Sequence, residues 1–476
     1  MDSKDLSGPR YWKSLDDLSE TPAFKEWVER EFPAGASELE GVNRRSFMKV
    51  MAASFGLAGL GVAGCRRPEQ VILPYSKQPE NVIPGIPVYY TTSQPGTRAH
   101  TPIIVETHTG RPTKIEGNPS YLANGAATSG FTQASLLDLY DPDRATKSFS
   151  GTERLSKEKL LDFISQLAEA AKQTGGEGFA VLAEPSSSPS RKRLVEALKA
   201  QYPAMLWAEY SPLHDSANEQ ALAKLLAQTA RALPRLDETK RILSLDADFL
   251  TGENGIAQSR AFAATRKVKD SKDAKQMSRL YAVESSLTQT GSMADHRLRL
   301  SCSQMAAFIA QLGLKILDAN AANAALLAAI RKIAATQDID ARWVAECAAD
   351  LLAYKGQSIV LVGEHLSPAV QAIAVAINQQ LAAPIDYVEI PAAEAGIELI
   401  AQKLKSKQID TLLILGGNPA YDAPADLNWP QLQQAAKRSI YFGGAHNETA
   451  ELANTFIAAS HYLESWGDGR AFDGTL

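Results

Sequence analysis

Short apolar runs that alternate with helical stretches constrain the fold of this chain more than any other feature. From about residue 155 onward, runs such as Ile359 to Val362 and Leu412 to Leu415 are separated by Ala-rich stretches of helical length. A strand that is apolar on both faces is buried on both faces, as in a parallel sheet covered by helices. The expected strands are 179–183, 205–209, 242–245, 280–283, 359–362, 412–415 and 440–442, and the clearest helices are 160–172, 304–316 and 321–335. The sequence therefore predicts an α/β fold with two doubly wound parallel-sheet lobes.

A small β region is expected before the lobes. Residues 88–117 alternate apolar and polar side chains, and Thr109 to Pro112 has turn composition, which together predict a β-hairpin. The expected organisation is an acidic N-terminal extension (1–42), an export segment (43–65), a Pro-rich arm (66–87), the small β region (88–150), one α/β lobe (151–355) and a second α/β lobe (356–476).

The segment 43–65 has the pattern of an export signal. Arg44 and Arg45 precede Phe47 and Lys49, and an apolar, Gly/Ala-rich run extends from Val50 to Gly64. Such a run is too short for an ordinary membrane span but suits the apolar part of a signal peptide, and paired arginines are typical of the twin-arginine route. We expect the chain to be exported in a folded state to the periplasmic face of a cytoplasmic membrane.

The cysteine at the end of this run is a candidate lipid anchor. Val62 to Cys65 resembles a lipobox, which predicts acylation of Cys65. The alternatives are an ordinary internal cysteine or an uncleaved signal that serves as a short anchor. Arg66 and Arg67, directly after Cys65, are unusual at an acylation site.

Composition excludes several kinds of site and partner. A net charge of −5 gives no basic field for collecting phosphates, so nucleic acid is not an expected partner. The three cysteines form no CxxC and no Cys/His cluster in the sequence, so we expect no metal site in this chain. For Cys302 and Cys347 we favour two buried free thiols over a disulfide.

Loops after the expected strands are the candidate ligand-binding segments, because ligands of open α/β sheets lie outside the carboxyl ends of the strands. Several are rich in Gly, Ser or Asn, which allows backbone N–H groups to approach an anion. None is a GxGxxG or Walker A motif, so ordinary strand-to-helix turns remain the alternative. These loops are 184–188, 246–249, 284–286, 363–365, 416–419 and 443–447.

The histidines show no i, i+4 pairing, which favours surface or hydrogen-bonded core positions over a relay or metal site. His296 and His461 are expected in a polar network or at an interface. The seven are His100, His108, His214, His296, His365, His446 and His461.

Several sequence blocks resemble molybdopterin-dependent oxidoreductases of the bis-guanine-dinucleotide type. Residues 113–119 (TKIEGNP) and 136–144 (LLDLYDPDR) resemble the start of that family, and 415–419 (LGGNP) and 445–449 (AHNET) resemble its later lobes. The resemblance implies a molybdopterin-oxidoreductase-like fold spread over most of the chain.

Other blocks resemble one branch of that family, the large iron–sulfur subunit of alternative complex III, a quinol oxidoreductase. They are residues 11–15 (YWKSL), the arm 66–85, 294–297 (ADHR) and 461–468 (HYLESWGD). In that subunit, a molybdopterin-like half without cofactor precedes a ferredoxin-like half that holds the clusters. The resemblance implies that 472–476 is followed in the family by a cluster-bearing domain, here expected as a continuation or a separate subunit.

Two departures from the catalytic members point to a chain without a redox centre. Residues 124–131 contain none of the cysteines that hold a cluster in those members. A molybdenum ligand from Ser, Cys or Asp could be sought at Ser186 to Ser188 or at Asp215, but nothing in the sequence singles one out. We therefore expect no catalytic, cofactor-binding or metal-binding residue in this chain.

The expected function is that of a non-catalytic, cofactor-free scaffold subunit of a membrane-attached respiratory quinol:electron-acceptor oxidoreductase. The resemblance implies three partners, namely a cluster-bearing ferredoxin-like domain or subunit, a membrane quinol-oxidising subunit and cytochrome c subunits. One alternative is an active molybdopterin-dependent oxidoreductase that lacks its iron–sulfur cluster. Another is a lipid-anchored, two-lobed binding protein.

Overall fold

The computed structural model describes residues 81–476 apart from residues 122, 124, 126, 214–220, 224–228, 253, 320–323 and 391–393, together with residues 21–23, 26, 77 and 80. The chain divides into two units, 1–80 and 81–476, and every named helix and strand belongs to the second. The expected export residues Arg44, Arg45, Phe47 and Lys49 and the expected acylation site Cys65 lie outside the described residues. Among the described helices, none combines the length and the apolar character needed to cross a membrane.

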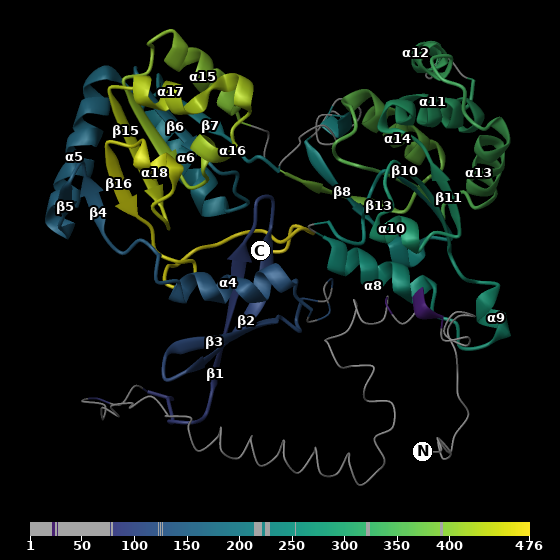
Figure 1. Ribbon diagram of the computed structural model, residues 1–476, viewed down its shortest axis with the longest axis horizontal. Coiled ribbons are helices and arrows are strands. Elements are labelled where there is room, and N and C mark those ends of the chain that lie inside the picture. Colours follow the sequence, from purple (N-terminus) through teal and green to yellow (C-terminus); the bar gives the residue numbers. More distant parts are fainter. Residues whose placement is uncertain are drawn as a thin grey trace. The chain divides into compact units, whose positions relative to one another are not determined.

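A three-stranded antiparallel sheet begins the second unit (Figure 1). Its strands are β1 (Val88–Pro95), β2 (His100–His108) and β3 (Arg111–Gly117). Thr109 and Gly110, with φ of 51° and 81°, form the two-residue turn between β2 and β3, a backbone conformation that matches the twist of a hairpin. Ile103 and Ile115 pack against Leu136 of α4 (Gly130–Tyr140). The predicted hairpin and turn are confirmed, with one strand more than expected.

A seven-stranded sheet follows, in the order β5-β4-β16-β15-β14-β6-β7. Its strands are β4 (Ser148–Ser150), β5 (Glu153–Leu155), β6 (Phe179–Ala183), β7 (Leu206–Glu209), β14 (Thr411–Leu415), β15 (Arg438–Gly443) and β16 (Thr455–Ala458). The neighbours from β16 to β7 pair in parallel, whereas β4, near one edge, pairs antiparallel with both β16 and β5. Ala180 and Leu182 join one apolar cluster while Val181 and Ala183 join another, so both faces of β6 are buried. The helices of this part are α5 (Lys157–Thr174), α6 (Pro189–Gln201), α15 (Ile397–Lys405), α16 (Pro419–Asp422), η4 (Ala425–Leu427), α17 (Trp429–Ala435) and α18 (Glu448–Glu451).

A second parallel sheet has the order β11-β10-β9-β12. Its strands are β9 (Arg241–Leu245), β10 (Arg279–Glu284), β11 (His296–Arg299) and β12 (Ser358–Val362). Leu243 and Leu245 pack in one core with Phe308 of α11, whereas Ile242 packs on the other face with Phe262 of α8. The helices are η2 (Leu236–Glu238), α8 (Gly255–Thr265), α9 (Ser271–Ala274), α10 (Gln289–Ser292), η3 (Cys302–Gln304), α11 (Met305–Ile316), α12 (Ala324–Ala334), α13 (Ala341–Ala353) and α14 (Pro368–Gln380).

The two parallel sheets interleave along the chain. The seven-stranded sheet takes β4 to β7 from before the four-stranded sheet and β14 to β16 from after it. A two-stranded antiparallel sheet, β8 (Ala230–Pro234) with β13 (Ile385–Glu389), pairs the two stretches of chain that connect them. The sheets therefore cut across the expected division between 151–355 and 356–476, because β12 completes the sheet of β9 and β6 pairs with β14.

Candidate functional site

A cleft of about 1010 Å³ lies where β6 and β7 end. Its walls come from the loop after β6, the start of α6, the loop after β13 and the segment around residue 470. Carboxyl ends of parallel strands are where α/β sheets bind ligands, so this cleft is the candidate site. Its charged lining residues are Arg98, Lys192, Glu196, Arg193, Glu209, Arg231, Glu389, Glu394, Glu398 and Arg470.

Part of this charge is committed to neighbouring groups of the chain. Arg98 pairs with Glu364 at 2.8 Å between Nη2 and Oε1. Arg231 donates to the backbone oxygen of Arg98 at 3.0 Å and lies 4.6 Å from the centre of the Phe472 ring. Through these contacts Arg98 and Arg231 hold the walls of the cleft together. Among the acidic lining residues, burial raises the pKa of Glu209.

The serines after β6 bind the C-terminal segment of the chain. Ser187 Oγ donates to the backbone oxygen of Arg470 at 2.9 Å, and Ser188 Oγ donates to the carboxylate of Asp468. Ser186 Oγ accepts the backbone N–H of Ser188 at 3.2 Å. Hydrogen bonds from Ser188 are the main reason that the pKa of Asp468 is lowered. Ser186 to Ser188, considered above as metal ligands, are thus used in a structural contact.

The Gly-rich loop after β14 holds a carboxylate of the chain itself. Gly416 and Gly417 have φ of 75° and 69°, a left-handed conformation that favours glycine, and the N–H of Gly416 is bonded to the backbone oxygen of Phe442 at 2.9 Å. Glu184, at the end of β6, places its carboxylate there and accepts the N–H of Gly417. Burial raises the pKa of Glu184, and the Gly417 hydrogen bond opposes that rise. The expected anion-binding loop is filled by this side chain.

The loops after β14 and β15 are cross-linked by their own polar groups. Asn418 Oδ1 accepts from Thr449 Oγ1 at 2.8 Å. Tyr441 donates its hydroxyl to the backbone oxygen of Gly417 at 2.9 Å and accepts from Asn447 Nδ2 at 2.9 Å. The blocks LGGNP (415–419) and AHNET (445–449) therefore meet at one edge of the sheet and bind each other.

The loops of the four-stranded sheet are joined in the same way. Asp248 Oδ1 accepts from Thr290 Oγ1 at 2.7 Å. Glu284 Oε1 accepts from Arg297 Nε at 2.5 Å. Asp248 and Glu284, two of the polar residues expected at the carboxyl ends of these strands, are thus bonded to α10 and to β11.

Three side chains at this second edge form a cluster that the sequence did not predict. One ligand atom each from Asp246, Cys302 and His365 lies within 4.8 Å of the others. Cys302 was expected to be buried but is exposed, while Cys347 is buried, and both thiols are free, as favoured above. The sequence did not predict strand β11, and without that strand nothing indicated that Cys302 lies beside the loops after β9 and β12.

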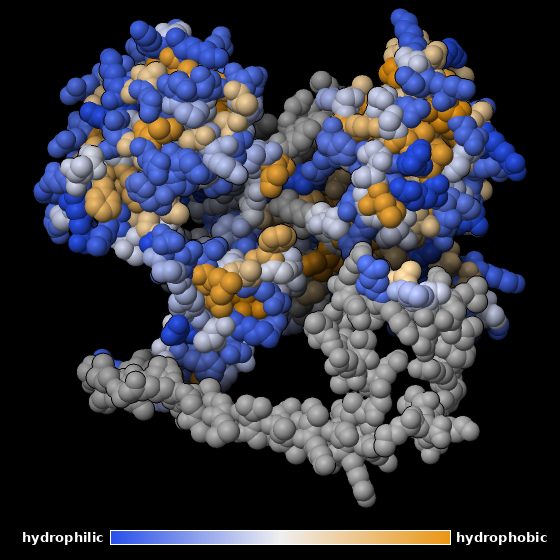
Figure 2. Space-filling model, in the orientation of Figure 1, coloured by the Kyte–Doolittle hydropathy of each residue, from blue (hydrophilic) through white to orange (hydrophobic). Residues whose placement is uncertain are grey.

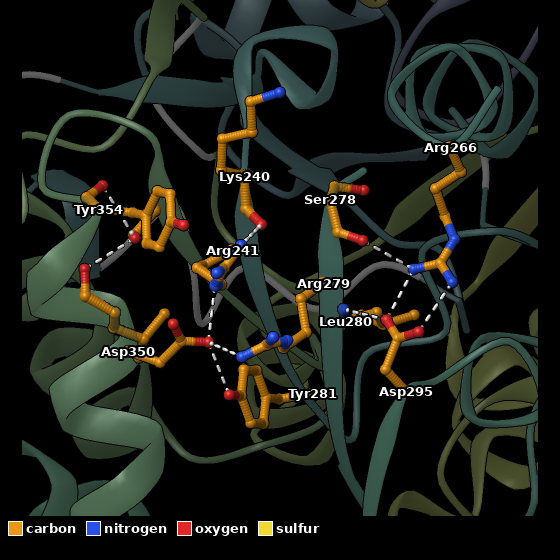
Figure 3. Close-up of polar contacts among 12 residues, drawn as sticks. Lys240, Arg241, Arg266, Ser278, Arg279, Leu280, Tyr281, Asp295, Asp350 and Tyr354 are labelled. Atoms are coloured by element: carbon orange, nitrogen blue, oxygen red, sulfur yellow. Dashed lines mark hydrogen bonds and ion pairs between the residues drawn. The ribbon is translucent and has the colours of Figure 1, made fainter. Parts of the chain in front are cut away.

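A polar network lies at the opposite, amino-terminal end of the same sheet (Figure 3). Asp350 Oδ2 accepts from Arg241 Nε at 2.6 Å, from Arg279 Nη1 at 2.9 Å and from the Tyr281 hydroxyl at 2.7 Å. The guanidinium of Arg241 also stacks 3.7 Å from the ring centre of Tyr354. This network ties α13 to β9 and β10, and its role is structural.

Most described histidines contact one neighbour each. His296 stacks on Tyr281 with ring centres 4.9 Å apart. Burial lowers the pKa of His461, whose Nε2 lies 3.2 Å from the backbone oxygen of Ser135. His214 and Asp215 lie outside the described residues. Among the described residues, no ring contact or hydrogen bond joins two histidines. The other described histidines are His100 beside Ser93, His108 beside Glu106, His365 beside Asp246 and His446 beside Phe456.

An apolar patch lies on α4. Phe131 is 89% exposed and Leu137 is 68% exposed, and Figure 2 shows hydrophobic surface gathered over this helix. Exposed apolar clusters of this kind mark interaction surfaces in soluble domains.

No family model matches this sequence, and no curated protein matches it. In solved structures the chain is similar to acetylene hydratase from Pelobacter acetylenicus, with 12% identity, a TM-score of 0.59, and coverage of 80% of this chain. It spans 63% of the length of that protein. It also matches the formyltransferase/hydrolase complex from Methylorubrum extorquens in complex with methylofuran, with 14% identity over 66% of this chain and 86% of that chain and a TM-score of 0.42. The likeness to acetylene hydratase shows a broad molybdopterin-type α/β fold.

Proposed function

We propose that this molybdopterin-type fold serves as a cofactor-free scaffold subunit in a membrane-attached respiratory quinol oxidoreductase of the alternative complex III type. In this proposal the chain is exported by the twin-arginine route and carries no electrons itself. It docks a cluster-bearing ferredoxin-like domain or subunit near a quinol-oxidising membrane subunit and cytochrome c subunits.

The observation that carries the proposal is the occupation of the Gly416–Gly417 loop by Glu184, whose Oε2 lies only 2.3 Å from the position that a Cβ on Gly416 would take. A molybdopterin dinucleotide needs hydrogen-bond donors for its phosphates and a protein ligand for its metal. Here the N–H of Gly417 is bound to a carboxylate, and the hydroxyls of Ser187 and Ser188 bind the C-terminal segment. The described residues at these loops therefore fit the cofactor poorly.

The patch on α4 supports a docking role. Phe131 and Leu137 expose large apolar side chains although α4 already buries Leu136 against the small sheet. The two side chains are six positions apart, about 120° around the helix, so a partner that covers both must contact more than one side of α4.

Metal and pterin analysis tests the absence of cofactor. The full chain is expressed in a host that makes molybdopterin and exports by the twin-arginine route, and its molybdenum, tungsten and oxidised pterin are measured. We expect far less than one molybdenum, tungsten or pterin per chain. Stoichiometric molybdenum with pterin would overturn the proposal in favour of the active oxidoreductase.

Purification from the membranes of the native host tests the partner. We expect the chain to co-purify with an iron–sulfur protein and c-type cytochromes, identified by mass spectrometry and haem staining. The double change of Phe131 and Leu137 to Glu should reduce this co-purification. The matched control is Tyr421→Glu, at a residue 76% exposed on α16, which should leave it unchanged. Equal recovery for both variants would show that α4 does not dock the partner.

The cleft of about 1010 Å³ favours one second candidate, a two-lobed binding protein. Its volume is at the upper end of the range of small-molecule sites. Native mass spectrometry of the protein purified from its host distinguishes the two, since a binding protein would retain a small ligand that Lys192→Ala or Arg193→Ala, at two cationic residues of the cleft lining, releases.

A further inference from the structure

Three strand ends of the four-stranded sheet bring together an aspartate, a cysteine and a histidine. Asp246 directly follows β9, Cys302 lies just beyond β11, and His365 lies just beyond β12. Their ligand atoms lie within 4.8 Å of one another, and His365 Nε2 is 3.1 Å from Asp246 Oδ2. The strands are parallel, so all three residues stand at the same edge of the sheet.

The backbone fixes two of these residues closely. Gly363 donates its N–H to the backbone oxygen of Leu245 at 2.9 Å. A Cβ added to Gly363 would lie 2.2 Å from the backbone oxygen of Asp246, so only glycine permits this approach of the two loops. His365 follows two residues later and is therefore held beside Asp246.

The carboxylate of Asp246 is oriented by a further contact. Its Oδ1 accepts the backbone N–H of Ser285 at 3.0 Å and the Ser285 hydroxyl at 3.2 Å. The Asp246 side chain is 6% exposed, whereas that of His365 is 56% exposed. The Ser285 hydroxyl also lies 3.2 Å from Oδ2, the oxygen that contacts His365. A buried carboxylate held by such an outer hydrogen bond is a usual arrangement of a metal ligand.

We propose that Asp246, Cys302 and His365 bind a zinc ion. Thiolate, imidazole and carboxylate are the ligands of Zn²⁺, while Ca²⁺ and Mg²⁺ take oxygen ligands. Zn–N and Zn–O bonds of about 2.0–2.1 Å in a tetrahedron place the two ligand atoms about 3.3 Å apart. His365 Nε2 and Asp246 Oδ2 are joined by a hydrogen bond of 3.1 Å, close to that separation, so a metal ion would replace this hydrogen bond with little movement of either side chain.

Binding replaces the thiol proton of Cys302 with the metal and releases that proton to solvent, so affinity falls as the pH is lowered. Cys302 and His365 are exposed, so a water molecule or a group from another molecule can take the fourth position of a tetrahedral ion. The site belongs to the four-stranded sheet and does not depend on the scaffold function proposed above.

Cobalt titration of the tag-free, full-length chain under a phosphine reductant tests the site. We expect one Co²⁺ per chain with a thiolate-to-cobalt charge-transfer band, which Zn²⁺ displaces. Cys302→Ser should abolish the band, and His365→Gln should weaken binding by at least the roughly 10- to 100-fold typical of outer-shell changes. The matched controls are Cys347→Ala and His446→Gln, which should bind as the wild type does.

A second measurement needs no substitution. In the wild-type chain, Zn²⁺ should slow alkylation of the exposed thiol of Cys302, read by mass spectrometry, while buried Cys347 is protected with or without metal. A charge-transfer band that survives Cys302→Ser, a wild-type affinity for His365→Gln, or alkylation of Cys302 that zinc does not change would each overturn the proposal.

Discussion

Replacing Asp350 with Asn tests the network that ties α13 to the four-stranded sheet. The side chain of Asp350 is 16% exposed and that of Arg241 is 9% exposed, so the ion pair between them is largely removed from water. Asn keeps the shape but leaves the charge of Arg241 uncompensated. Breaking a buried pair in this way costs about 3–5 kcal/mol. We expect about 3 kcal/mol, because Arg241 keeps its bond to the backbone oxygen of Lys240 and its stacking on Tyr354.

Hydrogen–deuterium exchange with peptide resolution measures this loss where it occurs. A loss of about 3 kcal/mol raises the opening equilibrium roughly 150-fold, so amides of β9, β10 and α13 should exchange faster by that factor. Peptides of the seven-stranded sheet serve as the internal reference. The control is Asp410→Asn, whose partner Lys437 is 78% exposed and which should cost under about 1 kcal/mol. Equal, small effects of both substitutions would refute the assignment of Asp350 as a buried anchor.

Three further predictions concern stability. Burial raises the pKa of Asp350 and Asp295, but hydrogen bonds, including those from arginines, outweigh burial, so both pKa values are lowered. The stabilisation by these two carboxylates is present above the ordinary Asp pKa of about 3.9 and should be lost as the pH falls through the lowered pKa values. Urea titration of the protein from pH 6 to pH 2 checks this loss. Phe308→Ala, at a fully buried position of α11, should lower the free energy of unfolding by about 3–5 kcal/mol in urea titration, and a loss under 1 kcal/mol would contradict the packing described. Gly416→Ala places a Cβ 2.3 Å from Glu184 Oε2 at a φ of 75°, and should cost about 1–3 kcal/mol by thermal melting, with partial recovery in the double variant with Glu184→Ala.

The apolar parallel strands could be predicted because strands buried on both faces consist almost entirely of apolar residues. The runs ending at Val362 and Leu415 have almost no polar residue, and β12 and β14 have the expected positions. Strand β11, His296–Arg299, was missed because it is an edge strand that pairs only with β10, and most of its side chains are charged or polar and exposed. Strands β8 and β13 were missed because they pair with each other across a long separation in sequence.

The location of the candidate loops could be predicted, but not their partners. Strand polarity places Gly416 and Glu184 at the same edge of a sheet once β6 and β14 are neighbours. Whether a glycine loop binds a ligand or a carboxylate of its own chain depends on side-chain geometry that spacing does not carry. The cluster of Asp246, Cys302 and His365 likewise exists only after three separate strands are aligned.

The interleaved order of the strands affects how the chain is made. In the finished sheet β6 lies between β7 and β14, yet the sequence of the entire four-stranded sheet separates β6 from β14. On the ribosome, the edge of β6 that faces β14 therefore stays unpaired until β14 has been synthesised, and exposed apolar strand edges invite aggregation. Nascent chains of this protein should depend on a chaperone that shields this edge until Thr411 to Leu415 has emerged.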